Sequence, residues 1–251
     1  MPHSANSRYK NRLLGLLDPQ DMSLLSPHLE RVELGLRDRL EQRGMPIKFV
    51  YFIEEGIGSI VARMAHGRDT EVGLLGHEGM TGTVAVLGGD LAPHECFVQA
   101  AGAAMRIPIA PFRDAFEQSP TLQRFLLQFV QCLMMQTSYT ALANARLRLE
   151  GRLARWLLMC EDRAGTELNI THEFLSIMLG VRRPGVTVAV QILEGNGLIR
   201  AMRGKIVIRD REGLIALADG SYGAPEAEYE KLLGSSPVRF KVVATSTAVS
   251  P

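Results

Sequence analysis

The chain has 251 residues, of which 46% are hydrophobic and 22% are charged. This length suits one large domain or two small ones, and the composition is typical of a globular protein with a substantial core. No apolar run reaches the roughly 18 residues of a membrane span, and the N-terminal segment lacks the apolar block of a secretory signal. The three cysteines form no CxxC pair, which argues against a disulfide framework or a structural zinc site. We expect a cytoplasmic protein with no membrane partner and no metal.

The net charge of +1 hides an uneven distribution along the chain. Residues 18–118 carry nine basic and fifteen acidic side chains, whereas residues 181–211 carry seven basic and two acidic ones. An acidic body with one short basic segment indicates a localised contact with a polyanion.

Short β-prone segments dominate the first third of the chain. Residues 47–53 and 58–64 precede a His-Gly-Arg-Asp turn at 66–69, and residues 70–75 follow it directly. This pattern predicts a β-hairpin, and the segment from 96 to 109 predicts a further strand after a loop with glycine and proline. Strands at such regular spacing favour a small barrel or β-roll, which we assign to residues 12–118.

A long helix is predicted from about Pro120 to Leu147, within a segment assigned to residues 119–148. Ser119 is a favourable N-cap and proline suits the first helical turn. Residues recur along this helix at spacings of three and four, near the heptad period of a coiled coil. We expect a homodimer through this face, although the same face could pack on its own domain. The candidate seam consists of Phe125, Phe129, Leu133, Gln136 and Thr140.

Residues 149–218 have the pattern of a winged helix-turn-helix. Residues 152–160 form an amphipathic helix, Thr171 caps a second helix, and Gly180 permits a sharp turn. The next helix ends at Gly195-Asn196-Gly197, and the basic segment LIRAMRGKIVI reads as a hairpin. Its predicted buried stripe is Val186, Ala189, Val190 and Leu193.

The candidate DNA contacts are exposed positions of this segment, all of them polar or basic except Val188. Arginine side chains at the start of the second helix suit base edges, whereas the basic hairpin suits phosphates. The candidates are Thr171, His172, Arg182, Arg183, Thr187, Val188, Gln191, Arg203 and Lys205.

These motifs resemble a known family. ITHEFLSIMLGVRRPGVTVAVQILEGNGLIR followed by RGKIVI resembles the DNA-binding module of the Crp/Fnr transcription regulators, and VYFIEEGIGSIV, the long helix and RLARWLL resemble the same family in the same order. The resemblance implies an α+β protein with an N-terminal cyclic-nucleotide-binding-like β-roll (a jelly roll), a dimerisation helix and a C-terminal winged helix-turn-helix. Residues 219–251 would form a partly disordered extension with a short helix at 225–233. The implied partners are a palindromic double-stranded DNA site, a second copy of the chain and RNA polymerase.

The opening of the recognition helix departs from the family pattern. Members usually have Ser or Thr, then Arg and Glu, where this chain has Arg182, Arg183 and Pro184. Arg183 keeps the type of side chain that reads guanine, whereas proline cannot accept a hydrogen bond from cytosine. We therefore expect a recognised sequence that differs from that of the best-known members.

The sensor pocket departs from the family pattern too. Cyclic-nucleotide-binding members use Gly-Glu for the ribose and Arg-Ser or Arg-Thr for the phosphate, and the corresponding positions here include Gly82, Thr83, His94 and Glu95. The glutamate and the arginine are missing, and Glu95 would repel a phosphate. This predicts a degenerate effector pocket with an unknown effector and no evident cofactor, while redox sensing through Cys96 stays open.

Three classes of function compete. The leading hypothesis is a sequence-specific homodimeric transcription regulator, and the alternative is a ligand-sensing module that acts through a protein partner without binding DNA. An enzyme is disfavoured, since the sequence has no GxSxG, HExxH or Walker motif and offers no catalytic residues.

Overall fold

The computed structural model describes residues 8–64 and 69–234. The expectations for residues 66–68 of the predicted turn and for the chain end beyond residue 234 therefore lie outside the described residues. Within the described part, no helix is both long enough and apolar enough to span a bilayer.

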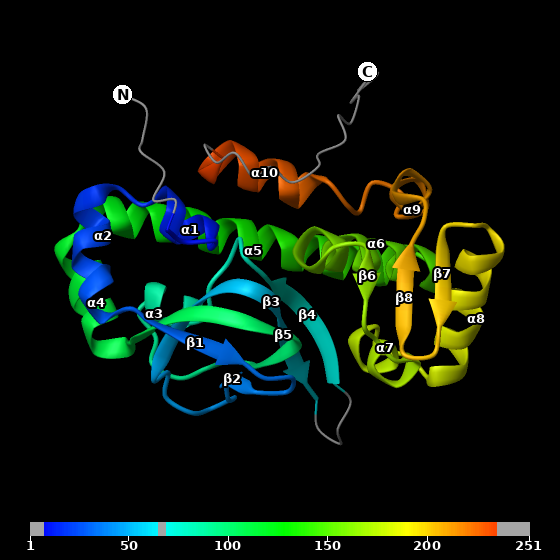
Figure 1. Cartoon of the computed structure of the whole chain (residues 1–251), viewed down its shortest axis with the longest axis horizontal. Coiled ribbons are helices and arrows are strands. Elements are labelled where there is room, and N and C mark those ends of the chain that lie inside the picture. The colour runs from blue at the N-terminus through cyan, green and yellow to red at the C-terminus, as the bar shows by residue number, and fades with distance from the viewer. Residues whose placement is uncertain (1–7, 65–68, 235–251) are drawn as a thin grey trace.

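An antiparallel sheet forms the N-terminal half (Figure 1). Its strands follow one another in the order β1-β5-β3-β4, with β2 also paired to β5. The predicted hairpin is confirmed as β3 paired with β4, in a register that runs from Arg63 opposite Asp69 to Gly58 opposite Leu75. The elements are α1 (Arg12–Leu16), α2 (Pro19–Leu25), η1 (Ser26–His28), β1 (Glu30–Leu34), β2 (Arg39–Glu41), β3 (Phe49–Arg63), β4 (Asp69–Leu75), α3 (Thr83–Val86) and β5 (Glu95–Pro108).

A long central helix connects the two halves of the molecule. After α4 (Ile109–Gln118), helix α5 (Pro120–Arg146) runs beside the sheet along the long axis of the molecule, as Figure 1 shows. Ser119 Oγ accepts a hydrogen bond from the Leu122 amide at 3.1 Å, which confirms the predicted cap. Helix α6 (Leu149–Ala164) then continues into the C-terminal half, where Gly165 ends it.

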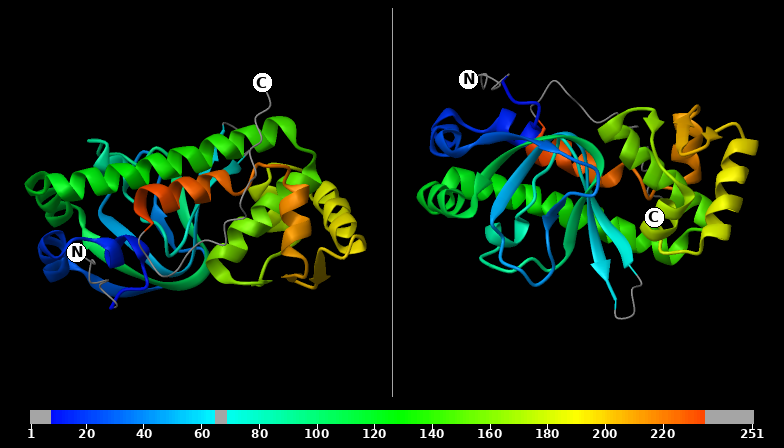
Figure 2. Two further views of the ribbon diagram at one scale, coloured as in Figure 1. Left: turned by 90° about the horizontal axis from the view of Figure 1, so that it is seen from above. Right: turned by 60° about the horizontal axis from the view of Figure 1, so that its bottom comes forward.

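The C-terminal half is a helix-turn-helix with a small sheet. It contains β6 (Glu167–Leu168), α7 (His172–Met178), α8 (Arg183–Gly195), β7 (Ile199–Met202), β8 (Lys205–Ile208) and α9 (Arg211–Leu217). The β7–β8 hairpin is the predicted wing, and its sheet has the order β6-β8-β7. Figure 2 shows α8 at the end of the molecule, away from the β-sheet. The last described helix, α10 (Ala224–Leu233), returns to lie alongside α5.

Two apolar clusters hold the molecule together. The first fills the space between the N-terminal sheet and helices α1, α2, α4 and α5. The second is the core of the helix-turn-helix, yet it also includes Ile57, Val61 and Leu74 from the sheet. Burial of these three side chains against the C-terminal half joins the two halves directly, because apolar surface removed from water stabilises their contact.

Candidate nucleic-acid interface

The turn between α7 and α8 has the geometry that the sequence predicts. Thr171 Oγ1 accepts a hydrogen bond from the Phe174 amide at 3.2 Å and so caps α7. Gly180 has a φ of +61°, a left-handed conformation that favours glycine. A side chain there would also meet Thr70 Oγ1 of β4 at 2.6 Å. Glycine at position 180 is therefore favoured for two reasons: the turn has a left-handed backbone conformation there, and the sheet lies too close for a side chain.

The two faces of α8 differ as predicted. The stripe of Val186, Ala189, Val190 and Leu193 is buried against the domain core. On the opposite face, Val188 is 53% exposed and Gln191 is exposed. The face available to a partner is thus the one that carries the candidate contacts.

His172 and Thr187 contact each other across the two helices. His172 Nδ1 lies 3.1 Å from Thr187 Oγ1, and this hydroxyl also donates to the Arg183 carbonyl at 3.3 Å. Both side chains therefore hold α7 against α8, and this internal role competes with a direct contact to DNA.

The basic residues of residues 181–211 fall into two groups. Lys205 pairs with Glu167, and Arg211 pairs with Glu161 and Asp162 inside the domain. The other five are exposed, and no acidic side chain of the described chain lies within ion-pairing distance of them: Arg182, Arg183, Arg200, Arg203 and Arg209. Their charges face solvent at the start of α8, along the wing and directly after it, which is the arrangement that a polyanion contact needs.

A carboxylate occupies the start of α3 in the predicted effector pocket. The Gly82 amide donates a hydrogen bond to Glu41 Oε1 at 2.5 Å. Gly82 has a φ of +77°, and a side chain there would meet Val50 Cγ2 at 2.7 Å. Burial raises the pKa of Glu41, while the Gly82 hydrogen bond opposes this shift. Thr83, the next candidate, opens α3 directly after this contact.

The other two predicted pocket residues lie at the start of β5. Glu95 is close to two arginines from neighbouring strands, with Arg39 Nε at 3.4 Å and Arg63 Nη1 at 3.7 Å. Burial lowers the pKa of His94, and the nearby Arg43 lowers it further. The Glu95 carboxylate partly neutralises the charges of Arg39 and Arg63, the two arginines that approach it.

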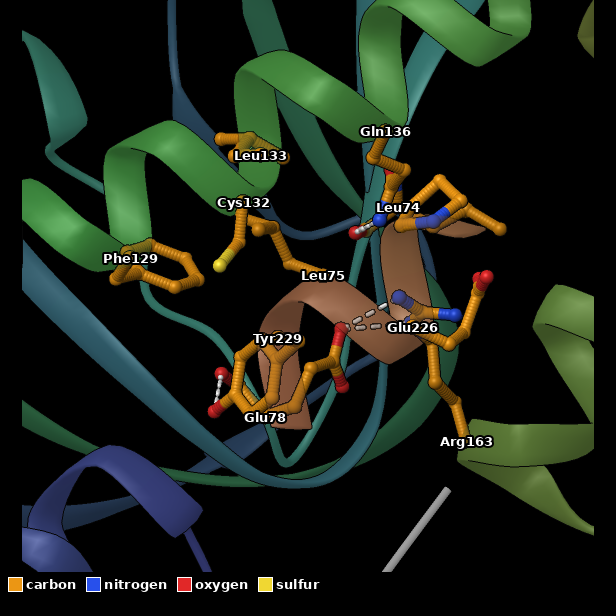
Figure 3. Close-up of a pocket in the computed structure, with 11 residues that line it drawn as sticks. Leu74, Leu75, Glu78, Phe129, Cys132, Leu133, Gln136, Arg163, Glu226 and Tyr229 are labelled. Atoms are coloured by element: carbon orange, nitrogen blue, oxygen red, sulfur yellow. Dashed lines mark hydrogen bonds and ion pairs between the residues drawn. The ribbon is translucent and has the colours of Figure 1, made fainter. Parts of the chain in front are cut away.

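The predicted dimer seam requires a correction. Phe129 is 3% exposed and Gln136 is 8% exposed in the single chain. Gln136 bonds to Leu74 through both its groups, since Oε1 accepts from the amide at 2.8 Å and Nε2 donates to the carbonyl at 3.2 Å. Figure 3 shows this face of α5 turned toward β4 and α10, where Tyr229 lies. Phe129 and Gln136 thus pack on their own chain, because the sheet and α10 cover them. Phe125, Leu133 and Thr140 are partly exposed.

A polar contact that the sequence did not predict joins the sheet to α6. Trp156 Nε1 donates to Glu71 Oε1 at 2.6 Å, and the Ser59 hydroxyl donates to the same carboxyl group. Burial raises the pKa of Glu71 to about 7 against the opposing effect of these hydrogen bonds. Simple alternation along β4 would place Glu71 on the face of Gly73 and Leu75. A register shift between Ile60 and Val61 instead pairs Glu71 with Val61, on the face that packs against the C-terminal half, so no local pattern signals this contact.

A second buried pair joins the turn after β4 to α6. Arg163 of α6 donates to Glu78 Oε1, with Nη2 at 2.6 Å and Nε at 2.9 Å. The Tyr229 hydroxyl of α10 donates to the Glu78 carbonyl at 2.7 Å, as Figure 3 shows. The cavity beside this pair measures only about 30 Å³, room for about one water molecule.

Comparisons with known proteins agree with this architecture. The family model of the cyclic nucleotide-binding domain matches residues 31–119, and that of the Crp-like helix-turn-helix domain matches residues 151–217. A search of curated protein sequences found no match.

Solved structures share the fold at low sequence identity. A putative Crp/Fnr regulator from Eubacterium rectale is 19% identical with a TM-score of 0.65, over 80% of this chain and 95% of that one. The c-di-GMP-responsive global regulator CLP from Xanthomonas campestris is 18% identical with a TM-score of 0.63, over 76% and 99% of the two chains. A Crp/Fnr regulator from Thermus thermophilus is 23% identical with a TM-score of 0.62, over 76% and 100%.

The two matched domains together cover more than half of the chain and occur in the order of the Crp/Fnr regulators. The chain belongs to the Crp/Fnr family of transcriptional regulators. It is a DNA-binding regulator of transcription with a sensor domain of the cyclic nucleotide-binding type.

Proposed function

We propose that the protein binds a specific palindromic DNA site as a homodimer and that α8 reads the bases. The observation that carries this proposal is the exposed face of α8, which begins with Arg182 and Arg183 and has no acidic partner within the described residues. Arginine side chains at the N-terminal end of a recognition helix reach base edges in the major groove, where the guanidinium matches guanine O6 and N7. Arg203 on the wing is suited to a phosphate contact.

An exposed apolar stripe on α5 supports the homodimer. Leu127, Met134 and Leu142 are 45%, 64% and 48% exposed, and they lie seven and eight residues apart on one side of the helix. Exposed apolar side chains at near-heptad spacing pair well with the same stripe of a second helix. In the proposed interface this stripe takes the place of Phe129 and Gln136, the two predicted seam residues that are buried within the single chain. A two-fold dimer through α5 presents two copies of α8 to successive major grooves.

We also propose that the sensor pocket does not accept a cyclic nucleotide. Glu41 already accepts the hydrogen bond of the Gly82 amide, and Glu95 adds a second carboxylate among the candidate pocket residues. A phosphate in this region would meet like charge and lack the arginine that the family uses, so the pocket has no favourable partner for it.

Selection of bound sequences from a random pool of duplex DNA, at a stated salt concentration, tests the proposed function. We expect a palindromic consensus whose half-sites lie about 34–36 Å apart, one turn of the double helix. RNA polymerase is then the expected partner at promoters that contain this site. Failure to enrich any sequence, together with undetectable affinity at low salt, would favour a module that acts through a protein partner.

A further inference from the structure

A large cleft lies between the two halves of the molecule, apart from the predicted effector pocket. Its volume is about 640 Å³, within the range of sites that hold small organic ligands. One wall comes from β3 and β5, the second from α6, and the third from the segment that leads into α7. An occupant of this cleft would therefore contact the sensor sheet and the helix-turn-helix at once.

Most of the side chains around the cleft are apolar. Ile57 and Ala100 belong to the sheet, Trp156 and Cys160 to α6, and Phe174 to α7. Burial raises the pKa of the Cys160 thiol well above its ordinary value, so this side chain is a neutral part of the wall. Such walls favour an aromatic or aliphatic occupant, because binding removes the apolar surface of both the ligand and the cleft from contact with water.

The rim of the cleft does not favour an anion. Arg37, Glu167 and Glu173 are the charged residues among those that line the cleft, and Glu167 is paired with Lys205. The lining residues thus carry one positive and two negative charges, and they include no group of basic side chains. A phosphorylated ligand such as a nucleotide would leave its charge without a partner, which favours an uncharged ligand.

One buried polar group in the wall lacks a partner. Gln99 is 8% exposed, and its Nε2 atom donates to Cys160 Sγ at 3.6 Å. Its Oε1 atom has no hydrogen-bond partner among the described residues. A buried acceptor without a donor is unfavourable, and a ligand that supplies an O–H or N–H group would remove this cost.

We propose that this cleft is a binding site for a small, uncharged and mainly apolar molecule that donates a hydrogen bond to Gln99. Because the walls come from both halves, the bound molecule contacts the elements that set the position of α7 relative to the sheet. The site itself is independent of the proposed function, whereas an effect of its ligand on DNA affinity rests on that function.

Two probes that differ by one O-methyl group test the site. 2-Naphthol has the hydroxyl donor, and 2-methoxynaphthalene has the same ring system without it. Trp156 is the only tryptophan of the chain and lines the cleft, so quenching of its fluorescence reports occupancy. We expect the wild-type chain to bind 2-naphthol about fivefold more tightly than the methyl ether, the effect of one hydrogen bond.

Four variants make the test specific. Gln99→Met should bind both probes equally, since methionine keeps the volume and lacks the acceptor. Ala100→Phe should fill the cleft and lose both probes, and Ala101→Phe serves the same purpose if the first variant does not fold. Gln128→Met, on α5 outside the cleft, should behave as wild type. Absence of quenching in the wild type, a retained preference in Gln99→Met, or unchanged binding in a folded cleft-filling variant would overturn the site.

A DNA titration tests the regulatory part separately. With the selected DNA sequence, saturating 2-naphthol should change the dissociation constant of the wild type severalfold and leave that of the folded cleft-filling variant unchanged. DNA binding that is identical with and without the probe would refute the regulatory effect, whereas DNA binding absent without any probe would refute the proposed function instead.

Discussion

The indole of Trp156 donates a hydrogen bond to the carboxyl group of Glu71 at 2.6 Å, across the boundary between the sensor sheet and the DNA-binding half. Glu71 is 6% exposed and lies on β4 next to Thr70, whose hydroxyl leaves no room for a side chain at Gly180 in the turn of the helix-turn-helix. A single strand of the sensor domain thus contacts both α6 and the turn before α8.

Glu71 should make stability depend on pH. Its pKa rises from 4.5 to about 7 on folding, chiefly because of burial. Between these values the unfolded chain loses the proton that the folded chain keeps, so this residue lowers wild-type stability as the pH rises through that window. Glu71→Gln cannot ionise and lacks this dependence. The variant should gain up to about 3 kcal/mol relative to wild type between pH 4.5 and pH 8.

Urea unfolding of both proteins at several pH values measures this difference. Contributions from other titrating groups cancel when the two free energies of unfolding are subtracted at each pH. A difference that stays constant from pH 4.5 to pH 8 would show that Glu71 titrates normally.

A double substitution and a single substitution on α5 should have different effects. Leu127→Glu with Met134→Glu places charge in the exposed stripe and should give folded monomers with weakened DNA binding. Phe129→Glu places charge in the core of the single chain and should unfold the protein, because truncation of a buried phenylalanine alone costs about 3–5 kcal/mol. Analytical ultracentrifugation and circular dichroism separate these outcomes. A double variant that remains dimeric would refute the exposed stripe as the interface.

Cyclic AMP should not bind the wild-type protein at micromolar concentrations. A cyclic phosphate needs a charge-assisted partner, and such hydrogen bonds contribute about 1.5–3 kcal/mol each. Here Glu41 holds the Gly82 amide, and Glu95 holds Arg39 and Arg63. Calorimetry provides the measurement, and heats that fit a micromolar dissociation constant would restore the nucleotide-sensor hypothesis.

The two basic residues of the wing should differ in their effect. Arg203 has no acidic partner in the described part of the chain, whereas Lys205 is paired with Glu167. Arg203→Ala should weaken binding to all sequences alike and reduce the slope of log K against log salt by about 1 per half-site. Lys205→Ala should reduce it less, since part of its charge is already neutralised. Equal slopes for the two variants would contradict this assignment.

The sequence predicts the parts of the fold that have strong local signals. Ser119 and Pro120 mark the start of α5, and Gly180 marks the turn before α8, because capping and left-handed conformations depend on a few adjacent residues. The buried stripe of α8 follows from helical periodicity alone. By contrast, β1 and β2 are short and largely exposed, so they carry little hydrophobic pattern.

The phase of α5 could not be predicted from spacing alone. Both faces of the helix carry apolar residues at intervals of three and four. The packing of β4 and α10 on Phe129 and Gln136 determines which face is buried within the chain. The role of Glu41 is also beyond local patterns, because its partner Gly82 is 41 residues away. Contacts between residues far apart in the sequence therefore determine the buried face of α5 and the partner of Glu41, which sequence periodicity does not predict.

The central claim is that Arg183 reads a base, and binding-site profiles of the wild type, Arg183→Ala and Arg203→Ala test it most directly. We expect Arg183→Ala to lose about 1–3 kcal/mol of affinity and to relax the preference at one base pair in each half-site. Arg203→Ala, the control for a phosphate contact, should keep every base preference. An Arg183→Ala profile with unchanged base preferences and only a smaller salt slope would show that Arg183 contacts phosphate and would contradict direct readout by this residue.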